Sequence, residues 1–299
     1  MKPRIAIPLP HGSDPDYALR AISQYERAVE LSGAEAVRIP LDRTPAEVMK
    51  LIETCDGVLL PGSKADVDPA KFDAERHPKT AAADPKRDTV DELLLQDAYN
   101  MRKPVLGICY GLQILNVYRS GTLVQHIESR VNHEAGKQVP LAHEVEIEEG
   151  SKLAEIVRTN ANDRERGGTG TPSSRAERCF KQDDRTTVSR SVPVRVNSSH
   201  HQSAERIGDG LKIVARCPTD RIVEAIEGTQ PEHFVLAVQW HPERSFDDDE
   251  NSKAIFRALV EAAREKHQHL SGEFEAQPNV AEGPARLRSG QVRATRSNR

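Results

Sequence analysis

A short segment of the sequence has the residue types of a reactive turn. Cys109 stands two residues from Gly107 and two from Gly111, and it follows the apolar residues 104–108. Small residues at those positions let a strand turn sharply into a helix, with the central side chain exposed at the carboxyl end of the strand. A helix N-terminus favours the reactive thiolate, and the N–H of Tyr110 is placed to hold an oxyanion. The alternative is that Cys109 is an ordinary buried thiol.

A candidate base and its orienting group follow 132 residues downstream of the cysteine. His241 comes after the apolar residues 234–238, so it would emerge at a strand end, and Glu243 can reach its second imidazole nitrogen. A cysteine nucleophile needs a base to take its proton. A carboxylate beside that base fixes its tautomer and stabilises its cation. Together these residues favour a catalytic Cys109, His241 and Glu243 set over a structural thiol.

The elements that must position these residues alternate between strand and helix in the first 120 residues. We predict strands at 4–9, 36–39, 57–60 and 104–108, and helices at 17–31, 45–52, 88–101 and 112–118. The second half adds strands at 139–147, 192–196, 211–215, 223–226 and 234–238, and a last helix at 252–266. This order predicts an α/β fold of three layers, with a doubly wound, mostly parallel central sheet and an antiparallel extension. The active site is expected at the carboxyl ends of the strands.

Composition sets the domain organisation and excludes several function classes. Residues 1–268 are expected to form one domain, with a flexible polar insertion at 158–190 and a disordered basic tail at 269–299, because both segments have almost nothing to bury. The net charge of −4 gives no electrostatic case for nucleic acid or an anionic membrane. The chain has neither a signal peptide nor a long apolar run, so we expect a cytoplasmic protein.

Metal and disulfide sites are not expected. The four cysteines lie far apart with no C-x-x-C pair, which argues against a disulfide framework. His126, His133 and His143 are spaced by seven and ten residues, without a cysteine or paired carboxylate nearby, so we predict no metal site and no cofactor. The acidic residues 247–250 are interpreted as the N-terminal cap of the last helix.

Five motifs occur in the order found in a known superfamily. They are Leu60–Ser63 with Asp66–Pro69, Gly107–Gln113, Asn197–Gln202, Val223–Glu227 and Gln239–Glu243. This set resembles the class I glutamine amidotransferase superfamily, and within it the γ-glutamyl-γ-aminobutyrate hydrolase family of cysteine peptidases. The resemblance covers residues 4–265 apart from the insertion.

The resemblance implies a hydrolytic mechanism. Cys109 would attack the δ-carbonyl of a γ-glutamyl group, His241 would carry the proton to the leaving amine, and Glu243 would orient His241. Water would then hydrolyse the γ-glutamyl thioester and release glutamate. The implied partner is a small-molecule γ-glutamyl substrate, as in polyamine catabolism, with no nucleic acid and no membrane. A homodimer is left open.

The resemblance also implies the residues that bind the oxyanion and the substrate. These are Gly62, Ser63, Tyr110, Gln113, His200 and His201. The backbone N–H of Tyr110 and that of Gly62 or Ser63 would hold the oxyanion, and the side chains of the others would line the pocket. Two departures from the family pattern are Tyr110, where arginine is common, and Ser63, where a second glycine is usual. These departures leave two points undetermined: which amine is the leaving group, and which backbone N–H is the second oxyanion donor.

Three functions are compatible with these residues. The leading interpretation is a cysteine hydrolase that cleaves γ-glutamyl amide bonds. The second is a glutaminase subunit that delivers ammonia to a separate synthase. The third is a non-catalytic homologue that binds a metabolite in the same pocket.

Overall fold

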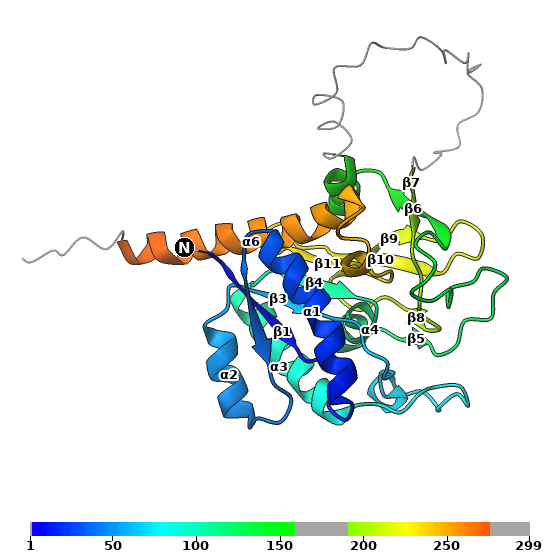
Figure 1. Ribbon diagram of the computed structural model, residues 1–299, viewed down its shortest axis with the longest axis horizontal. Helices are drawn as coiled ribbons and strands as arrows, with labels where there is room; N and C mark the ends of the chain where they lie inside the picture. The colour runs from blue at the N-terminus through cyan, green and yellow to red at the C-terminus, as the bar shows by residue number, and fades with distance from the viewer. Residues whose placement is uncertain (1, 159–190, 276–299) are drawn as a thin grey trace, which may run out of the picture.

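The computed structural model describes residues 2–158 and 191–275. Its first half alternates strands and helices, as the sequence predicts (Figure 1). In order these are β1 (Arg4–Pro8), α1 (Pro15–Leu31), β2 (Glu35–Ile39), α2 (Pro45–Glu53), β3 (Gly57–Leu60), η1 (Pro69–Phe72), α3 (Pro85–Met101), β4 (Val105–Ile108) and α4 (Tyr110–Tyr118). The second half contains β5 (Leu123–Val124), β6 (His143–Glu148), β7 (Ser191–Val196), β8 (Ser203–Ala204), β9 (Leu211–Arg216), β10 (Val223–Gly228), β11 (Val235–Val238), η2 (Pro242–Arg244) and α6 (Glu250–Glu275).

Nine strands of the described residues form one sheet, in the order β2-β1-β3-β4-β11-β10-β9-β6-β7. The strands from β2 to β11 in this order run parallel. β10, β9, β6 and β7 extend the sheet with antiparallel pairing. The predicted fold class, a mostly parallel sheet with an antiparallel extension, is confirmed. β5 and β8 pair with each other outside this sheet.

The register of the parallel strands brings three turns to one edge of the sheet. Leu60 at the end of β3 lies opposite Gly107 of β4, and Ile108 at the end of β4 lies opposite Val238 at the end of β11. The chain therefore leaves β3, β4 and β11 at the same carboxyl edge. Ligand sites of open α/β sheets form at this edge.

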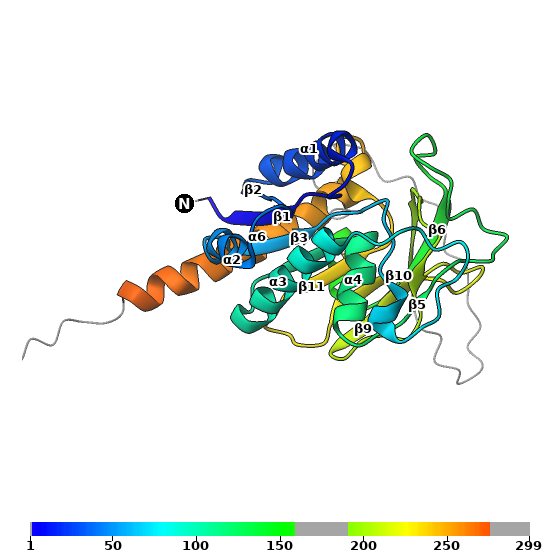
Figure 2. The same cartoon turned by 90° about the horizontal axis from the view of Figure 1, so that it is seen from below.

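Helices cover both faces of the sheet (Figure 2). α1 and α6 pack on one face, and α2, α3 and α4 pack on the other. Alternate strand residues point to opposite faces, so Ile5 and Ile7 of β1 join the first core whereas Ala6 joins the second. Burying one Ile or Leu side chain stabilises the fold by about 1.5–3 kcal/mol relative to exposure. The two cores hold the strands that carry the turns.

Acidic side chains cap three of the helices. Asp14 and Asp84 accept backbone N–H groups directly before a proline in the first turn of α1 and α3. Both helices consequently begin two or three residues before the predicted starts, because proline fits the first helical position. Asp249 accepts the N–H of Ser252 at the start of α6, as expected for the acidic run before that helix.

One strand begins later than the sequence pattern predicts, and one short helix is not predicted at all. β6 begins at His143 rather than at residue 139, because Pro140 has no N–H to donate to a strand ladder. Residues 152–158 are helical, and Leu153, Ala154 and Val157 pack into the core on the side of α1.

The last helix is longer than predicted. α6 continues to Glu275 instead of ending near residue 266, since the first proline after its start is Pro278. Residues 269–275, which the sequence places in a disordered tail, are thus helical. Of the insertion predicted at 158–190, residue 158 is helical, and residues 159–190 lie outside the described residues, as does the rest of the predicted tail.

Cys55, Cys109 and Cys217 are buried free thiols, whereas Cys179 lies outside the described residues. Among the helices of residues 2–158 and 191–275, none combines the length and the apolar character that crossing a membrane requires.

Candidate active site

Cys109 occupies a sharp turn between β4 and α4. Its φ of 53° is positive, which is uncommon for any residue but glycine. The flanking glycines permit this turn. A Cβ on Gly107 would lie 2.8 Å from the carbonyl carbon of Gly111, and a Cβ on Gly111 would collide with the carbonyl oxygen of Leu60. This is the strand-to-helix turn that the sequence predicts, but the expected exposure of the cysteine is wrong, because surrounding residues leave it only 6% exposed.

His241 follows β11 and is oriented by Glu243. The Nδ1 atom of His241 lies 2.7 Å from Oε1 of Glu243. A carboxylate only accepts hydrogen bonds, so Nδ1 donates and Nε2 carries the lone pair. Nε2 is buried and has no hydrogen-bond partner among residues 2–158 and 191–275. The imidazole therefore presents the acceptor that a general base needs.

Asn197 fixes the backbone of the same histidine. Its Oδ1 accepts the N–H of His241 at 2.9 Å, and its Nδ2 donates to the carbonyl oxygen of His241 at 2.8 Å. The family resemblance places the segment 197–202 near the substrate, but the Asn197 amide is engaged by the histidine backbone. Forty-four residues separate the two, so no local sequence signal reveals this contact.

Gly62 lies where the turns after β3, β4 and β11 meet. A Cβ on Gly62 would lie 3.0 Å from Cε1 of His241, 3.0 Å from the hydroxyl of Tyr25 and 3.6 Å from Cβ of Cys109. The cysteine and the histidine thus approach the same glycine. The N–H of Gly62 donates to the Tyr25 hydroxyl at 3.1 Å. Within the described residues, the N–H of Ser63 has no hydrogen-bond partner.

Burial sets the protonation states of the cysteine and the histidine. Burial raises the pKa of the Cys109 thiol to about 12, and Arg244 and the Tyr110 N–H oppose it only in part. Burial lowers the pKa of His241, although Glu243 raises it. Both groups are therefore neutral near pH 7. Burial thus opposes the thiolate that a helix N-terminus favours, because a buried charge is costly.

Cys109 lies in the wall of a pocket of about 230 Å³. The pocket is bounded by the turn after β3, the start of α4 and the segment after β7. Its lining includes four of the residues that the resemblance implies: Ser63, Gln113, His200 and His201. Gln113 is held by its own hydrogen bond, in which Nε2 donates to the carbonyl oxygen of Gln202 at 3.2 Å.

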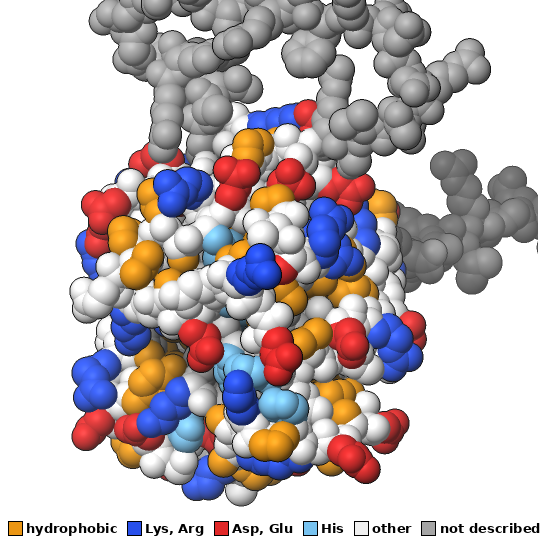
Figure 3. All heavy atoms as spheres, turned by 90° about the vertical axis from the view of Figure 1, so that its right-hand side faces the viewer, with side chains coloured by type: hydrophobic (Ala, Val, Ile, Leu, Met, Phe, Trp, Pro, Cys, Tyr) orange, Lys and Arg blue, Asp and Glu red, His pale blue; other side chains and the backbone are white. Residues whose placement is uncertain are grey.

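Side chains of both charge signs border the pocket. Lys64 and His201 can carry positive charge, and Asp66 and Glu134 carry negative charge. Nε2 of His201 is hydrogen-bonded to Oδ1 of Asp66 at 3.2 Å, and this hydrogen bond raises the pKa of His201. Figure 3 shows histidine side chains gathered on one face of the molecule, with acidic and basic side chains beside them. Such a lining is complementary to a ligand that carries both charges.

The side chain of Tyr110 points away from the pocket. Its hydroxyl donates to Oδ1 of Asp88 at 2.5 Å, and the guanidinium of Arg87 lies 5.0 Å from the ring centroid. The ring is 1% exposed and is not part of the pocket lining. The ring of Tyr110 therefore does not border this pocket, and the role of its backbone N–H as an oxyanion donor stays a prediction.

Arg87 of α3 holds two turns of the site in place, a role that the sequence does not predict. Its guanidinium is fully buried and lies 2.8 Å from the carboxylate of Asp91. The same group donates to the carbonyl oxygen of Pro10 at 3.2 Å and to that of Pro61 at 2.8 Å. One side chain of α3 thus binds the turn after β1 and the turn that carries Gly62. Sequence periodicity shows that α3 is a helix, but it does not show what a buried arginine contacts.

Of the three histidines that the sequence analysis considers as metal ligands, His126 lies apart from His133 and His143. Nδ1 of His126 lies 3.4 Å from Nδ1 of His201, beside the pocket. His133 and His143 instead meet His200 and Glu224 in a buried cluster. The spacing of histidines along the chain misses this cluster, because its members come from four separate segments.

Comparisons with known proteins show the family of the chain. The sequence profile of the family described as Peptidase C26 matches residues 11–165 and 178–243. A Mycobacterium tuberculosis protein, provisionally named a glutamine amidotransferase, is 32% identical over 245 residues, which cover 81% of this chain and 67% of that protein. The gamma-glutamyl-gamma-aminobutyrate hydrolase PuuD of Escherichia coli K12 is 26% identical over 251 residues, which cover 81% of this chain and 85% of that protein.

Solved structures share the fold. A Thermoplasma acidophilum protein, provisionally described as part of a GMP synthase, superposes with a TM-score of 0.55 at 14% identity, covering 91% of this chain and 98% of that chain. PurLQS from Thermotoga maritima superposes with a TM-score of 0.50 at 19% identity, covering 87% of this chain and 99% of that chain. At these identities the likeness is one of architecture.

Proposed function

The chain belongs to the peptidase C26 family, and on this basis we propose that it is a cysteine hydrolase that cleaves γ-glutamyl amide bonds through a γ-glutamyl thioester. One observation carries the proposal. The buried imidazole of His241 is hydrogen-bonded to Glu243 through Nδ1, its Nε2 has no hydrogen-bond partner in the described part of the chain, and its Cε1 lies against the same glycine that Cys109 approaches. The named hydrolase relatives support the same reaction class.

The neutral thiol and the neutral imidazole define the first step. Nε2 of His241 takes the Sγ proton as the sulfur of Cys109 attacks the δ-carbonyl carbon of the substrate. The carbon–nitrogen bond then breaks, and the imidazolium returns the proton to the leaving amine. In the second half, His241 takes a proton from water, which attacks the thioester carbonyl. Glutamate leaves and the thiol is restored.

Two backbone N–H groups are proposed to hold the negative oxygen of the tetrahedral intermediates. The N–H of Tyr110 lies at the first turn of α4, directly after the nucleophile. The N–H of Ser63 is assigned as the second donor, because the N–H of Gly62 is engaged by the hydroxyl of Tyr25. Preorganised donors of this kind stabilise the transition state without further rearrangement.

The pocket charges support an α-amino acid head group as the part of the substrate that is recognised. A γ-glutamyl group carries an ammonium and a carboxylate on its α-carbon, and it extends an amide from its side chain. Glu134 can pair with the ammonium. Lys64 and His201 can pair with the carboxylate if they exchange their present partners, Asp14 and Asp66, for it. Gln113 at the base of the pocket is placed to contact the glutamyl chain.

A panel of substrates tests the proposal. The purified protein is incubated side by side with γ-glutamyl-γ-aminobutyrate, other γ-glutamyl amines and glutamine, and the products are separated by liquid chromatography. We expect stoichiometric release of glutamate and free amine from at least one γ-glutamyl amine, and no release by Cys109→Ala. Full activity of Cys109→Ala, or hydrolysis of none of these amides, would refute the proposed function.

A glutaminase subunit is the second candidate, favoured by the glutamine amidotransferase name of the M. tuberculosis relative. Its reaction at Cys109 would be the same, with ammonia as the leaving group. The substrate panel separates the two functions. A glutaminase subunit would hydrolyse glutamine in preference to γ-glutamyl amines, and addition of a synthase partner would raise that rate.

A further inference from the structure

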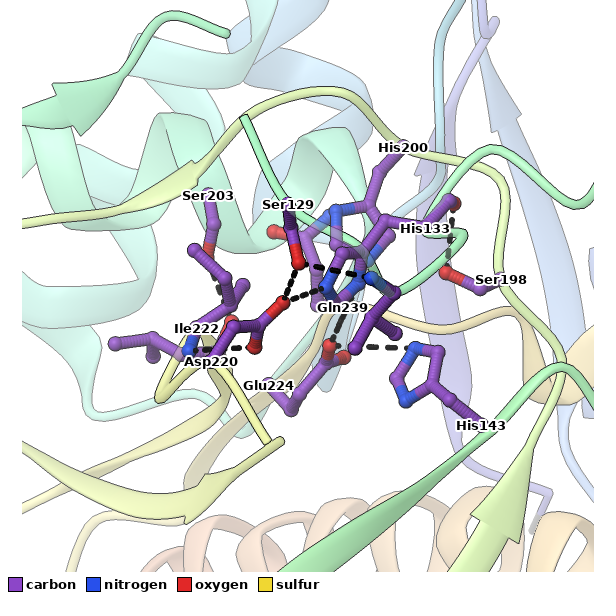
Figure 4. A network of polar contacts seen from close by, with 12 residues as sticks. Ser129, His133, His143, Ser198, His200, Ser203, Asp220, Ile222, Glu224 and Gln239 are labelled. Carbon is purple, nitrogen blue, oxygen red and sulfur yellow. Dashed lines mark hydrogen bonds and ion pairs between the residues drawn. The ribbon is translucent and has the colours of Figure 1, made fainter. Parts of the chain in front are cut away.

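A buried cluster of titratable side chains lies next to the catalytic pocket (Figure 4). It consists of His133, His143, His200 and Glu224, whose side chains are at most 6% exposed. One nitrogen of each histidine and one oxygen of Glu224 lie within 4.8 Å of one another. His200 is the member that also lines the catalytic pocket.

The distances in this cluster do not fit hydrogen bonds. Nδ1 of His133, Nε2 of His143 and Nε2 of His200 lie 3.3, 3.5 and 3.7 Å from Oε1 of Glu224. Hydrogen bonds between nitrogen and oxygen usually span about 2.7–3.2 Å. These three nitrogens and both carboxylate oxygens of Glu224 have no hydrogen-bond partner in the described part of the chain. Buried polar atoms without a partner are costly, and a carboxylate more so.

The outward nitrogen of each imidazole is engaged by an acceptor. Nε2 of His133 lies 2.8 Å from a carboxylate oxygen of Asp220. Nδ1 of His143 lies 3.2 Å from the carbonyl oxygen of the next residue, and Nδ1 of His200 lies 2.9 Å from the carbonyl oxygen of the second residue after it. Because these partners only accept, each outward nitrogen donates and the inward nitrogen keeps a lone pair when the ring is neutral. Histidines that bind metal ions are oriented in this way.

We propose that His133, His143, His200 and Glu224 bind a Zn²⁺ ion. Three inward lone pairs and a carboxylate repel one another unless a proton or a metal cation lies between them, and imidazole nitrogen and carboxylate oxygen are both zinc ligands. In a tetrahedral site with bonds of about 2.0–2.1 Å, the ligand atoms lie about 3.4 Å apart. The spacings of 3.3–3.7 Å around Oε1 of Glu224 match this value. An octahedral Mg²⁺ site would bring neighbouring ligands to about 3 Å.

A neighbouring group is a weaker candidate. His133, Cys217 and Asp220 also lie close together, but there His133 uses its other nitrogen. That nitrogen and the Asp220 carboxylate form a hydrogen bond of ordinary length, and Ser129 donates to the same carboxylate. These atoms are satisfied without an ion.

Four protein ligands make the proposed site closed, which is typical of structural zinc. The ion would join the segment between β5 and β6, the start of β6, the segment after β7 and strand β10. The segment after β7 carries Asn197, which holds the backbone of His241, and His201, which lines the pocket. The zinc would thus fasten one wall of the pocket and would take no part in bond cleavage.

Metal content tests the proposal independently of hydrolysis. The full chain is dialysed against Zn²⁺, freed of unbound metal and analysed by plasma mass spectrometry. We expect about one Zn²⁺ per chain in the wild type and a loss of at least about tenfold in Glu224→Gln and His143→Gln. His233→Gln is the matched control, because His233 is buried, bonds a backbone carbonyl and lies outside the cluster. It should keep its zinc.

Cobalt gives a second readout that needs no variant. The wild type loaded with Co²⁺ should show the strong visible absorption of tetrahedral coordination, and a chelator should lower the melting temperature. Weak absorption of octahedral cobalt would overturn the proposed geometry. Absence of stoichiometric zinc in the wild type, or equal zinc in the wild type and both cluster variants, would overturn the site, whatever the protein hydrolyses.

Discussion

The ring of His241 lies against Gly62 so closely that a Cβ on this glycine would come within 3.0 Å of Cε1 of the imidazole. The glycine therefore sets the position of the imidazole relative to Cys109. Position 62 requires glycine because a larger side chain would collide with its neighbours. Its backbone does not require glycine, since Gly62 is not among the glycines with positive φ.

Gly62→Ala should lower kcat by about 100-fold and change KM little, because a small displacement of a base has effects of this size. Steady-state kinetics on the best γ-glutamyl substrate measures it. Gly228→Ala is the control, since its Cβ would be equally crowded, at 3.0 Å from Cβ of Val235, near the opposite edge of the sheet. The prediction is contradicted if the two variants have the same kcat.

Asn197→Ala should lower kcat because it removes both hydrogen bonds that hold the His241 backbone. The lost bonds should also lower the free energy of unfolding by about 1–3 kcal/mol. Asn116→Ala provides the comparison, because the Asn116 amide also forms hydrogen bonds with backbone groups, those of residues 122, 206 and 208, and none of these belongs to the turn at Cys109 or to His241. Both variants should lose stability in denaturant titrations, but only Asn197→Ala should lose kcat. Equal kcat in both would mean that Asn197 does not position the base.

The pH dependence of kcat/KM should be that of an enzyme whose Cys109 thiol and His241 imidazole are both neutral. Burial lowers the pKa of His241 below 6.5, so activity should be lost only when the pH falls below that value and the base is protonated. The pKa of Cys109 is about 12, so no loss is expected between neutral pH and pH 9 or so. A basic limb near pH 8 would indicate a resting thiolate–imidazolium pair and would contradict this prediction.

Glu243→Gln should affect both the rate and the acidic limb. The carboxylate raises the pKa of His241, so its removal should move the acidic limb to still lower pH. The loss of stabilisation of the imidazolium should lower kcat by about 10²–10⁴-fold. Rate–pH profiles of the wild type and the variant measure both effects. A limb that moves to higher pH would show that Glu243 does not act on His241 in this way.

Arg87 and Asp91 form a buried ion pair, so substitutions of the two residues should have non-additive effects on the free energy of unfolding. Arg87→Met leaves an unpaired buried carboxylate and should lower the free energy of unfolding by about 3–5 kcal/mol. The double variant Arg87→Met, Asp91→Leu removes both charges and should be less destabilised than the sum of the single variants. Additive losses in denaturant titrations would mean that the pair does not interact.

The sequence predicts those parts of the site that depend on local pattern. The turn at Cys109 requires two glycines within five residues, and Glu243 lies two residues from His241, so both appear as short motifs. The fold class follows from the alternation of strand and helix. The same patterns place element ends less well, as at β6, where a single proline delays the strand.

Contacts between distant segments could not be predicted in the same way. Asn197 and His241 are joined across 44 residues, and the ligands of the proposed zinc site extend from residue 133 to residue 224. The neutral state of the cysteine also depends on burial, which composition does not reveal. These features arise only when the strands and their turns are assembled.

The central claim is that Cys109 carries a γ-glutamyl thioester during turnover. The direct test quenches the reaction with acid in its first turnovers and measures the intact mass and the peptide map of the protein. The account predicts a mass increase of one glutamyl group on the peptide that contains Cys109, present in Cys55→Ala and absent in Cys109→Ala. Glutamyl transfer to another residue, or turnover of Cys109→Ala at the wild-type rate, would contradict it.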